Sequence, residues 1–206
     1  MHADGHVHTE GRPFMINPGL PESLWAELNG GLWHATGHQG LAGIVADGFI
    51  RVGDRYHNSI CRRREAVSLF DFGPDALDQD DLMFTNWYSW LGSENDGRSA
   101  IWLEIDRKQS ADKLMSPKTL LDFVRTEPVK GRFFVGVEAC HEGPIAASAM
   151  VGALIIDGHD CSLFRRHAGG LPGLSEAVAS FVESLPPPPP ESPLVKALGE
   201  ARQRRR

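Results

Sequence analysis

The sequence lacks any long apolar run. No stretch of its 206 residues approaches the roughly 18 apolar residues that a membrane-spanning helix requires. The first residues, MHADGHVHTEGRP, do not combine a basic start with an apolar core, so we expect no secretory signal. The sequence therefore predicts a soluble cytoplasmic protein without a membrane partner.

Positive charge is also scarce. Lys and Arg number 21 against 27 Asp and Glu, a net charge of -6, whereas sequence-independent binding of nucleic acid needs a surplus of basic residues. Local clusters exist at Arg62 to Arg64, at Arg165 and Arg166, and at residues 202–206. We interpret the last two as solvated charge. This composition excludes a general polyanion-binding surface.

Cysteine is rare, and the three that occur do not form a metal-binding pattern. Cys61, Cys140 and Cys161 are odd in number and widely spaced, which suits a reducing compartment and fits no zinc ribbon. Three histidines lie close together between His2 and His8, but in a glycine- and proline-containing arm. We therefore assign no metal site.

Length and composition indicate one globular domain with two appendages. Hydrophobic residues make up 41% and charged residues 23%, which excludes a wholly disordered chain. We expect a flexible arm at 1–18, a domain at 19–185, and a proline-rich spacer with a basic tail at 186–206. The five prolines from Pro186 to Pro190 must be extended, and a linker is favoured over a ligand for an aromatic groove.

The stretch GLWHATGHQGLAGIVADGFI, residues 31–50, predicts a strand, a turn, a helix and a second turn. The strand begins at Leu32, the turn is GHQG, and Gly48 ends the helix in a left-handed conformation. His34 and Thr36 then lie near the end of the strand, where an imidazole and a hydroxyl could hold two ribose hydroxyls. The alternative is a strand histidine that bonds a neighbouring carbonyl.

Alternating apolar residues predict four further strands, and helical spacing predicts two further helices. The strands are AVSLFDF, SAIWLEID, GRFFVGVEACHEG and VGALIID, and the helices are SPKTLLDFVR and PGLSEAVASFVESL. Together they predict an α+β fold. In the third strand Glu138 shares a face with small or apolar neighbours, so its carboxylate must be either partnered or functional.

Two connecting segments carry possible ligand groups. RVGDRYHNSICRRRE is long for a compact domain and is a candidate ligand loop. LMFTNWYSWLG predicts a helix with three aromatic residues, Trp87, Tyr88 and Trp90. These belong either to the core or to a surface that stacks on a flat heterocycle.

Three motifs, taken in their order along the chain, resemble the ADP-ribosyltransferase superfamily, whose members split NAD and transfer its ADP-ribose. LWHATGHQGLAGIVADGFI resembles the opening strand and helix, AVSLFDF resembles the middle strand, and VEACHEGPI resembles the late strand with the catalytic glutamate. The last motif has the spacing E-A-x-x-x-G-x-I, which is closest to the DNA-modifying DarT-like toxin branch. The resemblance spans residues 31–157.

The resemblance implies a split antiparallel or mixed sheet with flanking helices, and NAD as co-substrate. It assigns catalysis to Glu138 and cofactor binding to a further set of residues: His34 and Thr36 at the ribose, Ser68 at the nicotinamide, Arg64 at the pyrophosphate, and Tyr88. It also implies a macromolecular acceptor and, for a toxin, an antitoxin or immunity partner. Any of Arg62 to Arg64 could contact the pyrophosphate.

The sequence departs from the family pattern in two places. Ser68 is not part of a Ser-Thr-Ser run, and Gly136 stands two residues before Glu138, which disfavours the arginine-modifying branch. Glu142 is an alternative catalytic carboxylate. No G-x-G-x-x-G fingerprint occurs, so a Rossmann-type nucleotide site is excluded. An RNA 2'-phosphotransferase-like enzyme and an inactive nucleotide- or protein-binding relative remain alternatives.

Overall fold

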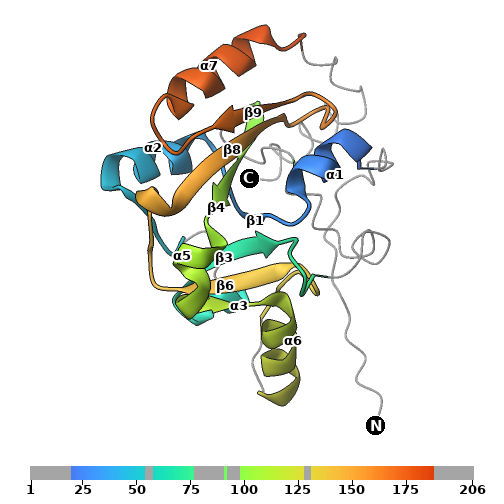
Figure 1. Ribbon diagram of the computed structural model, residues 1–206, viewed down its shortest axis with the longest axis vertical. Helices are drawn as coiled ribbons and strands as arrows, with labels where there is room; N and C mark the ends of the chain where they lie inside the picture. Colours follow the sequence, from blue (N-terminus) through green and yellow to red (C-terminus); the bar gives the residue numbers. More distant parts are fainter. Residues whose placement is uncertain (1–19, 54–57, 77–90, 92–97, 128–130, 188–206) are drawn as a thin grey trace, which may run out of the picture.

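The computed structural model describes residues 20–53, 58–76, 91, 98–127 and 131–187 (Figure 1). Within this part, the chain is an α+β protein with a seven-strand antiparallel sheet, a two-strand sheet and six α-helices, which confirms the predicted class. The predicted arm at 1–18, the aromatic segment at 82–90 and the tail beyond residue 187 lie outside the described residues. Over the same ranges, no helix combines the length and the apolar character needed to span a bilayer.

The elements have the following bounds. The large sheet contains β1 (Leu32–Thr36), β3 (Ala66–Asp71), β4 (Ser99–Ile105), β5 (Leu114–Met115), β6 (Glu138–Glu142), β8 (Met150–Asp157) and β9 (Phe164–Ala168). The small sheet pairs β2 (Phe49–Ile50) with β7 (Ile145–Ala146). The α-helices are α1 (Glu22–Leu28), α2 (His38–Asp47), α3 (Ile60–Arg63), α5 (Arg107–Ser110), α6 (Pro117–Thr126) and α7 (Leu174–Ser184). Two 3-10 turns, η2 (Ala111–Lys113) and η3 (Ala147–Ala149), complete the described part.

The large sheet narrows at its centre. Its strand order is β5-β6-β3-β1-β4-β8-β9, and β1 pairs with β3 only at Leu32↔Asp71 and Trp33↔Phe70. From His34 to Thr36, β1 continues along β4 without a partner pair on β3. In Figure 1, β3 and β6 run across the lower part of the molecule while β4 and β8 cross above them in other directions. Two residue pairs between β1 and β3 therefore join the two halves of the sheet, and beyond these pairs β1 and β3 separate.

Apolar side chains pack on both faces of the sheet. On one face, Leu41 and Ile44 of α2 and Val178 and Phe181 of α7 join a cluster that includes Leu69 of β3. The opposite face carries Trp33, Phe70 and Trp102, which pack with Leu24 and Leu28 of α1. Each such side chain stabilises the fold by roughly 1.5 to 3 kcal/mol on burial. The sheet is thus held in place from both sides, and residues on neighbouring strands keep a fixed register.

Alternation in the sequence predicts β3, β4 and β8 correctly, since Val67 and Leu69 pack in one cluster and Phe70 and Phe72 in the other. The two helices at 117–126 and 174–184 are also confirmed. Gly48 has φ 72° and ends α2 as predicted. The predicted GHQG turn is wrong, because α2 begins at His38 with Gly37 as its N-cap.

Two further predictions need correction. The strand predicted across 131–143 begins only at Glu138, since Gly136 has φ 77° and residues 135–137 form a turn. The connection predicted as a ligand loop contains α3, whose Ile60 and Cys61 are buried. Apolar residues in this segment make it part of the core, and residues 54–57 lie outside the described ranges.

Cys61 of α3 and Cys140 of β6 form a disulfide with a Cα–Cα distance of 5.6 Å. The sequence predicts cysteines suited to a reducing compartment and gives no sign of this bond. The two residues are 79 positions apart, so only the packing of α3 on β6 brings them together. Cys161 is a free cysteine.

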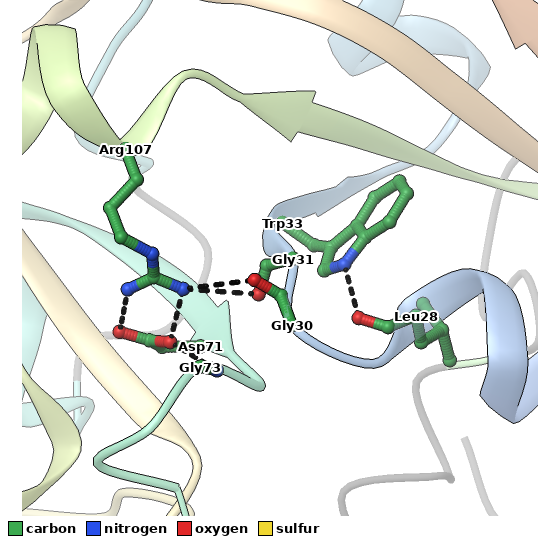
Figure 2. Close-up of polar contacts among 7 residues, drawn as sticks. All are labelled: Leu28, Gly30, Gly31, Trp33, Asp71, Gly73 and Arg107. Carbon is green, nitrogen blue, oxygen red and sulfur yellow. Dashed lines mark hydrogen bonds and ion pairs between the residues drawn. The ribbon is translucent and has the colours of Figure 1, made fainter.

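A buried ion pair holds the strand ends at the centre of the sheet (Figure 2). Asp71 is 1% exposed, and its two carboxylate oxygens accept hydrogen bonds from Nη1 and Nη2 of Arg107, both at 2.7 Å. Asp71 also accepts a 2.7 Å bond from the Gly73 amide, and Arg107 Nη2 lies 3.4 Å from the Gly31 carbonyl oxygen. Arg107 therefore connects the end of β3 with the residues that lead into β1.

Candidate active site around Glu138

Glu138 is a buried carboxylate with two hydrogen-bond donors. It is 4% exposed, Oε1 accepts from the Ser68 hydroxyl at 2.7 Å, and Oε2 accepts from the Phe134 amide at 2.7 Å. Cys61 Sγ lies 3.3 Å from Oε1. Donors from two different segments of the chain thus hold the two oxygens in fixed positions, and the Cys61 sulfur lies against one of them.

The sheet register and one turn account for this arrangement. Glu138 pairs with Phe70, and Ser68 pairs with Cys140, so Ser68 and Glu138 are diagonal neighbours on one face of the sheet. The turn at 135–137 brings the backbone of Phe134 back to Glu138, whose own amide donates to the Phe134 carbonyl at 2.9 Å. The turn that interrupts the predicted strand is therefore what supplies the second donor to the carboxylate.

The environment of Glu138 favours its neutral form. Burial raises the pKa of the carboxyl from 4.5 to about 7, while the bonds from Ser68 and Phe134 oppose the shift. Near neutral pH the group is consequently divided between its acid and its carboxylate. A cation that arrives beside it would favour ionisation, since an opposite charge lowers the pKa of an acid.

His34 is linked to Glu138 through Ser68. Its Nδ1 lies 3.1 Å from the Ser68 carbonyl oxygen, and because a carbonyl only accepts, Nδ1 is the donor. Burial lowers the pKa of His34, which favours the neutral imidazole, and the bond to Ser68 offsets this only in part. In that tautomer Nε2 is an acceptor. The imidazole thus bonds a carbonyl on one side and offers a lone pair on the other.

Thr36 lies apart from this chain of contacts, against the first turn of α2. A Cβ added at Gly40 would be 2.1 Å from Thr36 Oγ1, so the glycine leaves room for the hydroxyl. Among the described residues, no hydrogen bond joins Thr36 to His34, Ser68 or Glu138. The structure brings together three of the predicted site residues, His34, Ser68 and Glu138, whereas Thr36 lies at the end of β1 against α2.

Arg64 pairs with the alternative carboxylate. Its Nη2 lies 3.4 Å from Glu142 Oε1, and its guanidinium stacks 4.4 Å from the centre of the Phe123 ring. The Glu142 side chain is 65% exposed, in contrast to that of Glu138. Tyr88 lies outside the described residues. Arg64 and Glu142 therefore form a surface pair at the other end of β6.

Sequence reasoning does not identify two of the contacts of Glu138. The Phe134 amide is missed because residues 133–137 alternate like a strand, although Gly136 is a signal for a turn. Cys61 is missed because nothing in its local sequence marks it as a neighbour of β6.

Of the cavities lined by described residues, one of about 390 Å³ lies beside Arg98 and Asp157, and one of about 160 Å³ lies between α2 and α7. Neither includes Glu138.

The burial of Glu138 predicts a pH dependence of stability. The folded state has a pKa of about 7 against an ordinary 4.5, so it binds the proton more tightly than the unfolded chain does. The contribution of protonated Glu138 to the free energy of unfolding is complete below pH 4.5 and is lost as the pH rises through 7. At about 1.4 kcal/mol per pKa unit, the loss amounts to roughly 3 kcal/mol. Urea unfolding between pH 5 and 8 measures it. Glu138→Gln should flatten the curve, and an equally steep curve in that variant would assign the effect to other groups.

The contact between Gly40 and Thr36 predicts a difference between two matched variants of α2. Gly43→Ala meets no atom within 4 Å, so the better helix propensity of alanine should stabilise the protein by up to about 1 kcal/mol. Gly40→Ala should gain clearly less, because Thr36 must rotate away from the new Cβ. Urea unfolding compares the two, and equal gains would mean that Thr36 is not confined by the helix.

Comparison with known proteins finds no match, whether among protein-family models, curated proteins or solved structures.

Proposed function

We propose that this chain is an NAD-dependent ADP-ribosyltransferase, which cleaves the nicotinamide–ribose bond and transfers ADP-ribose to a macromolecular acceptor. One observation carries the proposal: Ser68 connects the His34 imidazole with the Glu138 carboxylate at the point where the β1–β3 ladder ends. The order of the three sequence motifs supports it independently. In the proposal the chain resembles the DarT-like toxins, acts in the cytoplasm, and has an antitoxin or immunity partner.

The proposed chemistry requires a carboxylate beside a developing cation. Cleavage of the bond to nicotinamide leaves positive charge on the ribose, which a carboxylate at Glu138 stabilises while polarising a ribose hydroxyl or activating the acceptor. NAD itself carries a cationic nicotinamide, whose arrival favours the ionised form of Glu138. The Nε2 lone pair of His34 accepts a bond from a ribose hydroxyl. In this proposal Thr36 and Tyr88 contact the cofactor, and Arg64 exchanges Glu142 for the pyrophosphate.

A second candidate function is an NAD-binding relative without turnover. It is favoured by the 4% exposure of Glu138 and by the two protein donors that already satisfy its oxygens. A buried acid with this many partners can serve the fold alone. An RNA 2'-phosphotransferase is less favoured, because such an enzyme needs several basic side chains directed at a phosphate, and the middle of the sequence has one dense basic cluster, Arg62 to Arg64.

Incubation of the full chain with NAD, with measurement of free nicotinamide and of NAD binding by calorimetry, tests the proposal. Release together with binding supports the transferase. Binding without release supports the inactive relative, and the absence of both overturns an NAD-dependent function. Single-stranded DNA, RNA and protein acceptors, each added with NAD carrying a label on its adenine, identify the class that receives ADP-ribose.

A further inference from the structure

The Cys61–Cys140 disulfide lies directly against the candidate catalytic carboxylate. Cys61 is fully buried and Cys140 is 1% exposed, and the bond fastens α3 to β6 two residues from Glu138. Cys61 Sγ is 3.3 Å from Glu138 Oε1 and 3.6 Å from the Ala139 carbonyl oxygen. The sulfur is therefore within hydrogen-bonding distance of two acceptors.

The oxidation state of Cys61 decides whether that contact is a hydrogen bond. A disulfide sulfur has no proton, so it presents lone pairs to Oε1 and gives a carboxylate no stabilisation. A thiol at the same position can donate, and a donor to the charged form of an acid favours ionisation. Reduction thus adds a third donor beside those of Ser68 and Phe134.

We propose that the Cys61–Cys140 bond is a redox control on the Glu138 site, in which reduction turns Cys61 into a hydrogen-bond donor that holds Glu138 as the carboxylate. This regulation rests on the proposed transferase function. The oxidised protein is the less active form, and the reduced protein is the active one.

The reductant is a dithiol. Its thiolate attacks one sulfur of the bond, which releases the other cysteine and leaves a mixed disulfide between the reagent and the attacked cysteine. The second thiol of the reagent then displaces the cysteine held in that mixed disulfide. The dithiol loses two electrons and becomes a cyclic or protein disulfide, while Cys61 and Cys140 each gain one electron and one proton. Both sulfurs are buried, so attack requires opening of α3, which is a single turn of four residues.

The cytoplasmic location that belongs to the proposed function favours a regulatory bond over a purely structural one. In a reducing cytoplasm, disulfides are usually transient, catalytic or redox-sensing. The sulfurs also lie next to the one carboxylate whose ionisation the proposed reaction needs. A structural bond has no requirement for that neighbour.

Other charges near Glu138 do not obscure the effect. The ionisable groups on the elements packed around it are Arg62, Arg63 and Arg64 of α3, His34 of β1, Asp71 of β3, and His141 and Glu142 of β6. Within the described residues, none of them forms an ion pair with Glu138, and the shift of its pKa arises from burial opposed by Ser68 and Phe134. A new donor at Cys61 should therefore be visible in the titration of this carboxyl.

Two alanine variants form a matched test. Cys140→Ala and Cys61→Ala both lack the disulfide and so share any loss of stability that its absence causes. Only Cys140→Ala keeps a thiol beside Glu138. The measurement is the titration of the Glu138 side-chain carboxyl by carbon NMR on glutamate-labelled protein, with the signal assigned by its absence from Glu138→Gln.

We expect the titration midpoint of Cys140→Ala to lie below that of Cys61→Ala by roughly half a unit to one unit, as for one charge-assisted hydrogen bond. Oxidised wild type should match Cys61→Ala, and wild type reduced with dithiothreitol should match Cys140→Ala. Equal midpoints in the two variants, or in oxidised and reduced wild type, overturn the proposal. If either variant does not fold, the wild-type comparison decides alone.

Nicotinamide release then separates this inference from the function on which it rests. In an active enzyme, the pH profile of release should move to lower pH on reduction by the same amount as the carboxyl titration. Absence of release in both redox states overturns the transferase, whereas the NMR titration still decides whether the disulfide controls Glu138.

Discussion

Replacing Glu138 by glutamine is expected to lower nicotinamide release by about 10³-fold or more while the fold is kept. The amide has the size of the acid, its oxygen can accept from the Phe134 amide, and its NH₂ can donate to the Ser68 hydroxyl, which reverses its role. What is lost is the negative charge at the developing ribose cation, a loss of several kcal/mol of barrier. Release is measured at saturating NAD, and calorimetry checks that binding persists.

Glu142→Gln is the matched control, because it makes the same chemical change four residues further along β6. The Glu142 side chain is 65% exposed and pairs with Arg64 at 3.4 Å, so its loss should cost at most about 1 kcal/mol of stability. Its nicotinamide release should stay close to that of the wild type. Unchanged nicotinamide release in Glu138→Gln would mean that Glu138 is not the catalytic carboxylate. Loss of release in Glu142→Gln alone would assign that role to Glu142.

The parts of the fold that the sequence predicts well are those in which one local rule decides. β3 alternates because its two faces pack against different clusters, so Leu69 and Phe70 could be assigned to opposite sides before any contact was known. Glu138 is buried, as expected for an acid among apolar neighbours, although the alternation at 133–137 from which we expected it belongs to a turn. Burial of an acid in turn requires partners, which Ser68 and Phe134 provide.

The rest depends on information that alternation does not contain. Residues 133–137 have the pattern of a strand, but Gly136 adopts φ 77° and turns the chain, which alternation cannot register. Cys61 and Cys140 meet only because α3 packs on β6, 79 positions away in sequence. For His34, the interpretation as a strand histidine that bonds a carbonyl is confirmed at Nδ1, while ribose binding at Nε2 stays a prediction.

Removing the Asp71 side chain is expected to cost roughly 3 kcal/mol of stability. Asp71→Ala leaves Arg107 without its two 2.7 Å bonds and the Gly73 amide without its acceptor (Figure 2). Breaking a buried pair from one side costs about 3 to 5 kcal/mol, and the 34% exposure of Arg107 places the estimate at the lower end, since water can partly replace the carboxylate. Urea unfolding at pH 7 measures the loss.

The pair of Asp47 and Arg51 provides the comparison that isolates burial. These side chains are 51% and 62% exposed, so Asp47→Ala should cost at most about 0.5 kcal/mol although it also removes a 3.0 Å ion pair. Arg107→Ala should be at least as harmful as Asp71→Ala, because it leaves the buried carboxylate uncompensated, and the double variant should cost less than the sum of the two. A loss below about 1 kcal/mol in Asp71→Ala, or strict additivity in the double variant, would mean that the packing of β1 against β3 holds the strand ends without this ion pair.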